Sequence, residues 1–293
     1  MEKYYKTNEN TIGKIRVERD DEPLNPRTED DGNIGHMMCW HPKYALGDKN
    51  PFNTVDEFFD ELITQEYTKK QLVNMAKNRK IPKLEIAYNR ETREYSLIAE
   101  YTRYYPKKER VYDEVVSGVN AHDLYDLFED VLEYMNNATK MQLLEEKGYV
   151  FLPLSIYDHS GITMYVGGRL DHYDGQWDCS DVGWIYTTKK EVMESGCRYR
   201  AGNNRYYDIT ENNWKKASEI ILKGEVEIYD QYLVGDVYGF IIEEYDKDSE
   251  DWQEVESVWG YYSDKWGDDL VQELASEAGI TEELVNDVVK LIA

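Results

Sequence analysis

A stretch rich in glycine and aspartate, between residues 157 and 181, holds the side chains best suited to metal chemistry. Histidine nitrogens and carboxylate oxygens are the ligands with which proteins bind zinc or manganese. The candidate ligands are two Asp-His pairs, Asp158 with His159 and Asp171 with His172. A metal held there would support a metal-dependent hydrolase. The spacing fits no standard metal motif, and Asp and Gly also build turns, so a structural loop is the alternative.

A second candidate pair is Cys39 with His41, since residues two apart on a strand share a face and could form a thiolate–imidazole pair. The run from Met37 to Trp40 is typical of a hydrophobic core, which favours a buried strand instead. The chain has three widely spaced cysteines, which indicates reduced thiols and no disulfide framework. No nucleotide-loop or serine-hydrolase signature occurs, and no cofactor is expected.

Aromatic residues point to recognition of other proteins. The chain has 26 tyrosines, and tyrosine contributes large contact area at low cost in side-chain entropy. Residues 101–110 form a basic aromatic patch, in which Tyr101, Tyr104 and Tyr105 are the candidate contact residues. Such a patch can also bind single-stranded nucleic acid. On an acidic chain, a protein contact is the favoured interpretation.

Charge is distributed unevenly. The formal net charge is −25, of which residues 1–63 carry −6, residues 64–149 carry −1 and residues 150–293 carry −18. Binding to nucleic-acid phosphates needs clustered Lys and Arg, so direct nucleic-acid binding is not expected. A basic protein surface would instead be attracted. The candidate acidic contacts are Asp246, Asp248, Glu250 and Asp251. The alternative is that the charge serves only solubility.

Hydrophobic periodicity predicts the elements that position these residues. Capping boxes predict helices starting after Thr54 and Thr188. A long helical stripe over 120–146 is interrupted at Asn136-Asn137, and two helices are expected near the C-terminal end, the last capped by Thr281. Strands are expected at 12–19, 84–88, 95–105, 110–116, 149–157, 182–186, 238–245 and 255–262.

Because these strands are mostly joined as hairpins, the predicted fold class is α+β with a mixed or antiparallel sheet. The predicted core comprises residues 1–63 and 149–293, with C-terminal helices. Residues 64–148 are predicted to form an inserted α-βββ-α module or arm.

Four segments carry a resemblance to a family of proteins encoded by phages and prophages. They are 31–49 (DGNIGHMMCWHPKYALGDK), 154–164 (LSIYDHSGITM), 181–189 (DVGWIYTTK) and 225–243 (EVEIYDQYLVGDVYGFIIE), the last followed by 258–262 (VWGYY). Shorter members of this family have no segment that corresponds to residues 64–148, so that segment resembles an insertion. Within such phage proteins the chain most resembles inhibitors of the Gabija defence system.

That resemblance implies a non-enzymatic anti-defence protein that binds and blocks a bacterial nuclease–helicase complex, and it implies no catalytic residues. An acidic DNA-mimic antirestriction protein and the metal-dependent hydrolase are the two alternatives. A homo-oligomer is expected. No run approaches the roughly 18 apolar residues of a membrane span, and no secretory h-region is seen near Met1. The expected location is therefore the cytoplasm of the host bacterium.

Overall fold

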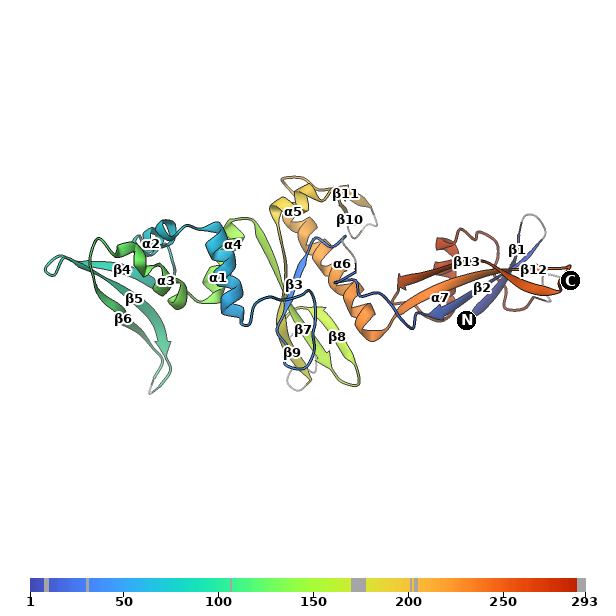
Figure 1. The fold of residues 1–293 in the computed structure, drawn as a ribbon, viewed down its shortest axis with the longest axis horizontal. Helices are drawn as coiled ribbons and strands as arrows, with labels where there is room; N and C mark the ends of the chain where they lie inside the picture. The colour runs from blue at the N-terminus through green and yellow to red at the C-terminus, as the bar shows by residue number, and fades with distance from the viewer. Residues whose placement is uncertain are drawn as a thin grey trace.

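The chain folds as an α+β protein in which antiparallel sheets and helices form three units in a row (Figure 1). The structure is a computed structural model, and it describes residues 1–7, 11–29, 32–105, 107–169, 178–200, 202 and 205–288. The predicted fold class is confirmed. Within the described residues, none of the helices combines the length and apolar character needed to cross a membrane.

One end unit contains Met1 together with residues 237–288 (Figure 1). Its sheet has the order β1-β2-β12-β13, so strands more than 200 residues apart in sequence lie side by side. Helix α7 covers the sheet through Leu270, Val271 and Leu274. The elements are β1 (Glu2–Lys6), β2 (Ile12–Arg19), β12 (Val237–Asp246), β13 (Asp251–Tyr262) and α7 (Gly267–Glu277).

The second predicted C-terminal helix is wrong over the described residues 281–288, which contain an isolated β-bridge. Val285 donates its backbone N–H to Tyr4 and accepts one from it, at 2.8 and 2.9 Å. These bonds to β1 replace intrahelical ones. The apolar spacing that predicted a helix is used here to pack Leu284 against the sheet.

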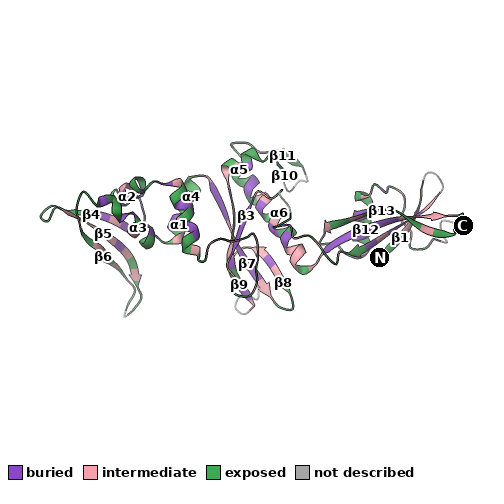
Figure 2. Cartoon of the chain, viewed as in Figure 1, coloured by how far each residue is buried: buried purple, intermediate pink, exposed green. Residues whose placement is uncertain are grey.

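The middle unit is a four-stranded sheet with buried side chains on both of its faces (Figure 2). Its order is β3-β9-β7-β8, with helices α5 and α6 and a small β10-β11 hairpin beside it. Alternation along the strands sends Met37 and Ile185 towards α6 and their neighbours Met38 and Trp184 towards α1. The elements are β3 (His36–Cys39), β7 (Tyr149–Asp158), β8 (Ile162–Val166), β9 (Cys179–Thr188), α5 (Lys189–Glu194), β10 (Arg198–Arg200), β11 (Tyr206–Asp208) and α6 (Trp214–Val234).

The third unit combines a three-stranded sheet with a layer of helices on one of its faces. The break predicted at Asn136-Asn137 is confirmed, because Asn136 accepts the Thr139 backbone N–H at 2.9 Å and so caps a new helix. The elements are α1 (Val55–Glu66), α2 (Lys69–Lys77), β4 (Leu84–Asn89), β5 (Glu94–Arg103), β6 (Glu109–Val119), a 3-10 turn η1 (Leu124–Leu127), α3 (Phe128–Tyr134) and α4 (Asn137–Glu146).

Two features of this layout differ from the predicted domain organisation. Residues expected to form one core contribute to two separate sheets, β1-β2-β12-β13 and β3-β9-β7-β8. Helix α1, assigned to that core, packs with α4 in the third unit. It also bridges the units, since Phe59 lies 5.8 Å from Phe151 and 5.3 Å from Trp184 between ring centroids.

A buried arginine fastens the segment between β2 and β3 to the middle unit. The Arg27 side chain, 1% exposed, binds both carboxylate oxygens of Asp48 at 2.8 and 3.0 Å and Glu225 at 2.8 Å. The Nη2 atom that binds Asp48 also donates to the Gly35 carbonyl, at 2.6 Å. Burial opposes the charge, but the hydrogen bonds to Asp48 and Glu225 outweigh it and raise the pKa of Arg27. The Arg27 side chain is therefore charged and is held by four hydrogen bonds.

Candidate functional site

The predicted metal ligands are described only in part. Asp158 ends β7 and accepts the Tyr44 hydroxyl at 3.1 Å, while the exposed His159 ring lies 3.5 Å from Asp178. Asp171 and His172 lie outside the described residues. Within the part of the chain that is described, no three His, Cys, Asp or Glu side chains are grouped to hold a metal ion. The hydrolase hypothesis stays a prediction, which metal analysis of the purified protein tests.

Cys39 and His41 have different surroundings. Cys39 is buried, and burial raises the pKa of its thiol to about 12. A thiol with that pKa is not a thiolate at neutral pH and is a poor nucleophile. The ring of His41 stacks on Tyr44 at 4.9 Å between centroids. The buried-strand interpretation of Cys39 therefore agrees with its environment, and a thiolate–imidazole pair does not.

The three predicted tyrosines lie at the far end of the β5-β6 hairpin, which projects from the third unit (Figure 1). Tyr104 and Tyr105 are 74% and 86% exposed in the connecting loop. Tyr101 lies on β5 and donates its hydroxyl to Asp113 on β6 at 2.6 Å. We call residues 101–110 the tyrosine hairpin. Its four basic residues and single glutamate give it a positive charge.

The predicted acidic contacts Asp246, Asp248, Glu250 and Asp251 surround the turn between β12 and β13. Asp246 builds the turn itself, because it accepts the Asp248 backbone N–H at 2.9 Å and the Ser249 hydroxyl at 2.8 Å. These bonds, that to Asp248 foremost, lower the pKa of Asp246. The other three carboxylates are exposed, so the turn presents negative charge to the solvent.

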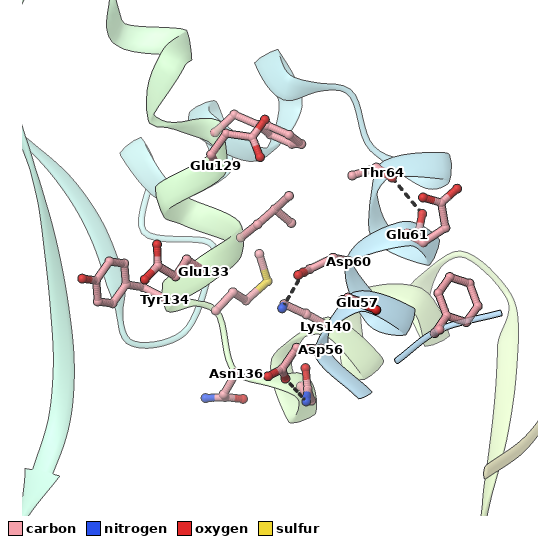
Figure 3. Close-up of a pocket in the computed structure, with 15 residues that line it drawn as sticks. Asp56, Glu57, Asp60, Glu61, Thr64, Glu129, Glu133, Tyr134, Asn136 and Lys140 are labelled. Atoms are coloured by element: carbon pink, nitrogen blue, oxygen red, sulfur yellow. Dashed lines mark hydrogen bonds and ion pairs between the residues drawn. The ribbon is translucent and has the colours of Figure 1, made fainter. Parts of the chain in front are cut away.

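An acidic groove in the third unit has a volume of about 1030 Å³ (Figure 3). Helix α1 and the start of α4, which packs beside it, form one side, and α3 forms the other. Apolar side chains of Phe128, Leu132 and Met135 contribute to its lining. We call this concavity the acidic groove. Its carboxylates are Asp56, Glu57, Asp60, Glu61, Glu129 and Glu133.

Helical spacing explains why these carboxylates lie together. Residues four apart share a helix face, which places Asp56 with Asp60 and Glu129 with Glu133. The cation within the groove lining is Lys140, whose buried amine forms an ion pair with Asp60 at 2.5 Å. Lys69, which is not part of the lining, lies 3.5 Å from Glu129. The lining thus keeps a negative excess, which favours a positively charged occupant.

The acidic groove was missed by sequence reasoning, although part of its signal was present. The spacing of four in Asp56-Asp60 and Glu129-Glu133 predicts acidic faces on two helices. The local sequence does not predict that these two helix faces, about 70 residues apart in the chain, lie opposite each other. The charge of each sequence segment did not reveal the groove either, because four of its six carboxylates lie in residues 1–63 and two lie in the near-neutral residues 64–149, together with the basic tyrosine hairpin.

Two carboxylates in the middle unit have strongly shifted pKa values. Burial opposes ionisation of Glu191, but bonds from His36 at 2.7 Å and from Thr188 outweigh it and lower its pKa to about 2. For Asp230 on α6, the effect of burial outweighs that of hydrogen bonding. Burial raises the pKa of Asp230 to about 6, although the carboxylate accepts the Met164 backbone N–H at 2.7 Å. The burial and hydrogen-bond partners of Glu191 and Asp230 account for both pKa shifts without a role in binding or catalysis.

Replacement Asp230→Asn is expected to stabilise the protein at pH 7. Because the folded-state pKa of about 6 lies above the ordinary value of 3.8, the folded state holds the proton more tightly and loses stability as pH rises from about 4 to 6. The amide keeps the acceptor for Met164 without the charge. After allowance for solvent screening, the expected gain is about 1 kcal/mol at pH 7 and less at pH 4.

Urea unfolding at the two pH values measures this gain. Glu227→Gln removes one charge from an exposed position of the same helix and serves as the control. An Asp230→Asn gain that is as large at pH 4 as at pH 7 would contradict the burial explanation.

Comparison with known proteins adds no relative: no protein-family model, no curated protein and no solved structure matches the chain. The functional conclusion therefore depends on the groove, the hairpin and the charge distribution of this chain.

Proposed function

We propose that the chain is a phage-encoded anti-defence protein that binds and blocks a nuclease-containing bacterial immune complex of the Gabija type, without catalysis. The observation that carries this proposal is that the third unit presents two separate surfaces of opposite charge. An exposed basic tyrosine hairpin and an acidic groove both suit contacts with a protein partner.

The elongated shape supports a blocking role. A protein that prevents a nuclease from engaging DNA needs more contact than a standard interface of roughly 1,600 Å². Three units in a row present a total accessible surface of 18138 Å² (Figure 1). We propose that copies of the chain also associate in the host cytoplasm, which light scattering of the purified protein measures. Direct contact with nucleic acid is not part of this proposal.

In this proposal the acidic groove accepts a basic segment of the immune complex. Lys and Arg extend apolar stems beneath a charged end group, which suits a groove with apolar side chains in its lining and carboxylates around them. Because Glu129 and Glu133 are exposed, both can contact a partner without rearrangement.

Co-purification with the Gabija nuclease subunit tests the proposal. The wild-type chain is expected to recover the nuclease, and Glu129→Lys/Glu133→Lys is expected to lower the affinity about 100-fold because it opposes like charges. The matched control is Glu91→Lys/Glu114→Lys, which makes the same charge change at exposed sites of the same unit. Absence of the nuclease from the wild-type eluate rejects the proposal.

A DNA-mimic antirestriction protein is the second candidate. It is favoured by the exposed carboxylates of the edge strand β13, at Asp251, Glu254 and Glu256. Binding by surface charge alone weakens steeply with added salt. Affinity that falls with salt, together with loss of binding in Glu254→Gln/Glu256→Gln, would favour the mimic. Salt-insensitive binding would favour packed aromatic contacts.

A further inference from the structure

We propose that a second cleft, between segment 20–29 and the end of β13, binds an arginine side chain of a partner protein. The identity of that partner as an immune complex rests on the function proposed above, whereas the chemistry of the cleft does not. The cleft has a volume of about 460 Å³, within the range of ligand pockets. It lies in the end unit that contains β1, β2, β12 and β13, away from the acidic groove.

Trp259 provides the aromatic surface of the cleft, and the sheet is built to hold it there. The register of β12 and β13 shifts between Tyr238 and Phe240, so that Gly239 faces a β-bulge. The Trp259 ring lies so close to Gly239 that a Cβ at that position would be 2.2 Å from it. Trp259 nevertheless stays 44% exposed. Bulges of this kind redirect side chains at edge strands.

The opposite wall is fixed at several points. The Asp20 backbone N–H donates to the Val237 carbonyl at 2.8 Å, and the Tyr262 hydroxyl donates to the Leu24 carbonyl at 3.0 Å. Further along, Arg27 anchors the segment in its buried network. A wall held at several points loses little conformational freedom when a ligand enters, which favours binding.

The charges of the cleft select a cation. Asp20, Glu22 and Glu29 line it, and its described lining includes no Lys or Arg. Two arginines are near in sequence, but each has carboxylate partners. Arg19 pairs with Asp236 at 2.9 Å, and Arg27 pairs with Asp48 and Glu225. An uncharged apolar ligand would leave three carboxylates without a counter-charge, which makes it a poorer occupant than a cation.

Arginine fits this combination better than lysine. Its planar guanidinium stacks on an aromatic ring and also donates two parallel hydrogen bonds to a carboxylate. The exposed Leu24 side chain and the ring of Tyr262 offer apolar contact for its aliphatic stem. The cleft therefore supplies an aromatic surface, apolar walls and carboxylates together, as recognition of an arginine side chain requires.

Titration with a blocked peptide, acetyl-Gly-Arg-Gly-amide, tests the cleft directly by NMR. The signal of the Trp259 indole N–H, assigned by its loss in Trp259→Phe, is expected to shift on binding in the millimolar range. The citrulline analogue, which has the shape of arginine without its charge, is expected to bind about five-fold or more weakly, and the lysine analogue in between.

The variant Glu22→Gln/Glu29→Gln changes exposed side chains and is expected to weaken arginine-peptide binding about five-fold. Glu254→Gln/Glu256→Gln, on β13 outside the cleft, is expected to bind as the wild type does. Equal binding of the citrulline peptide, an unchanged affinity in Glu22→Gln/Glu29→Gln, or no shift of the Trp259 signal would each overturn the proposal.

The peptide titration also separates this site from the proposed function. If the protein binds the arginine peptide but does not recover the Gabija nuclease, the proposed cleft is supported and the proposed function is rejected. Recovery of the nuclease without peptide binding would reject the cleft alone.

Discussion

Replacement of Arg27 by methionine is expected to lower the free energy of unfolding by about 3–5 kcal/mol, because it leaves two carboxylates without their counter-charge. Glu225 is 10% exposed and Asp48 is 21% exposed at the side chain. Both also accept backbone N–H groups, Ile34 at 2.8 Å for Glu225 and Met37 at 2.8 Å for Asp48. Neither can leave for the solvent without breaking those bonds.

Urea unfolding of Arg27→Met measures the loss. The matched control is Arg19→Met, which removes a 57% exposed arginine from its pair with Asp236 and is expected to cost no more than about 1 kcal/mol. Adding Asp48→Asn and Glu225→Gln to Arg27→Met removes the orphaned charges while keeping the acceptors, and is expected to recover part of the loss. Equal losses for Arg27→Met and Arg19→Met would contradict this account.

The same network affects the arginine cleft. Arg27 follows Pro26, which lines the cleft, and holds the segment against α6. Loosening that anchor frees one wall of the cleft and adds an ordering cost to binding. Arg27→Met is therefore expected to weaken arginine-peptide binding even where the protein stays folded, which the NMR titration detects.

Replacement of the two most exposed tyrosines, Tyr104→Ala/Tyr105→Ala, is expected to lower affinity for the immune complex about 100-fold or more with little change in stability. Interface hot spots are enriched in tyrosine, and their truncation costs 2 kcal/mol or more each. In the free chain both side chains are mostly exposed, so the fold loses little contact when they are removed. This prediction rests on the proposed function.

Competition binding with the wild-type chain measures the effect, and unfolding curves verify that the stability is unchanged. Tyr88→Ala/Tyr206→Ala serves as the control, because these tyrosines are 48% and 58% exposed but lie outside the tyrosine hairpin. Undiminished binding of Tyr104→Ala/Tyr105→Ala would show that the hairpin is no contact surface.

Local features of this chain could be predicted well because local sequence produces them. The Thr188 capping box is present in full: its hydroxyl accepts the Glu191 backbone N–H, and the Glu191 carboxylate accepts the Thr188 N–H in return. The predicted strands 84–88 and 95–105 are joined as a hairpin, in whose turn the Asn89 side chain accepts the Glu91 N–H at 2.9 Å. Each involves residues within a few positions of one another.

The errors share a physical reason as well. A helix was predicted after Thr281 from apolar spacing, but the backbone of Val285 gains two hydrogen bonds to Tyr4 at the other end of the chain. A local sequence pattern cannot predict a hydrogen-bond partner so far away in the chain. Helix α1 was correctly predicted to start after Thr54, but its Phe58 and Phe59 pack against Tyr186 and Phe151 of the middle sheet, which lie about 90 or more residues further along the chain.

The sequence by itself determined the fold class, most strands and caps, and the uneven charge, because these follow from residue type and short-range spacing. Only the tertiary structure decided which distant residues meet. It joined Asp56 and Asp60 to Glu129 and Glu133 in one groove, and it placed segment 20–29 beside Trp259. These meetings depend on the packing of whole elements, which no local pattern encodes.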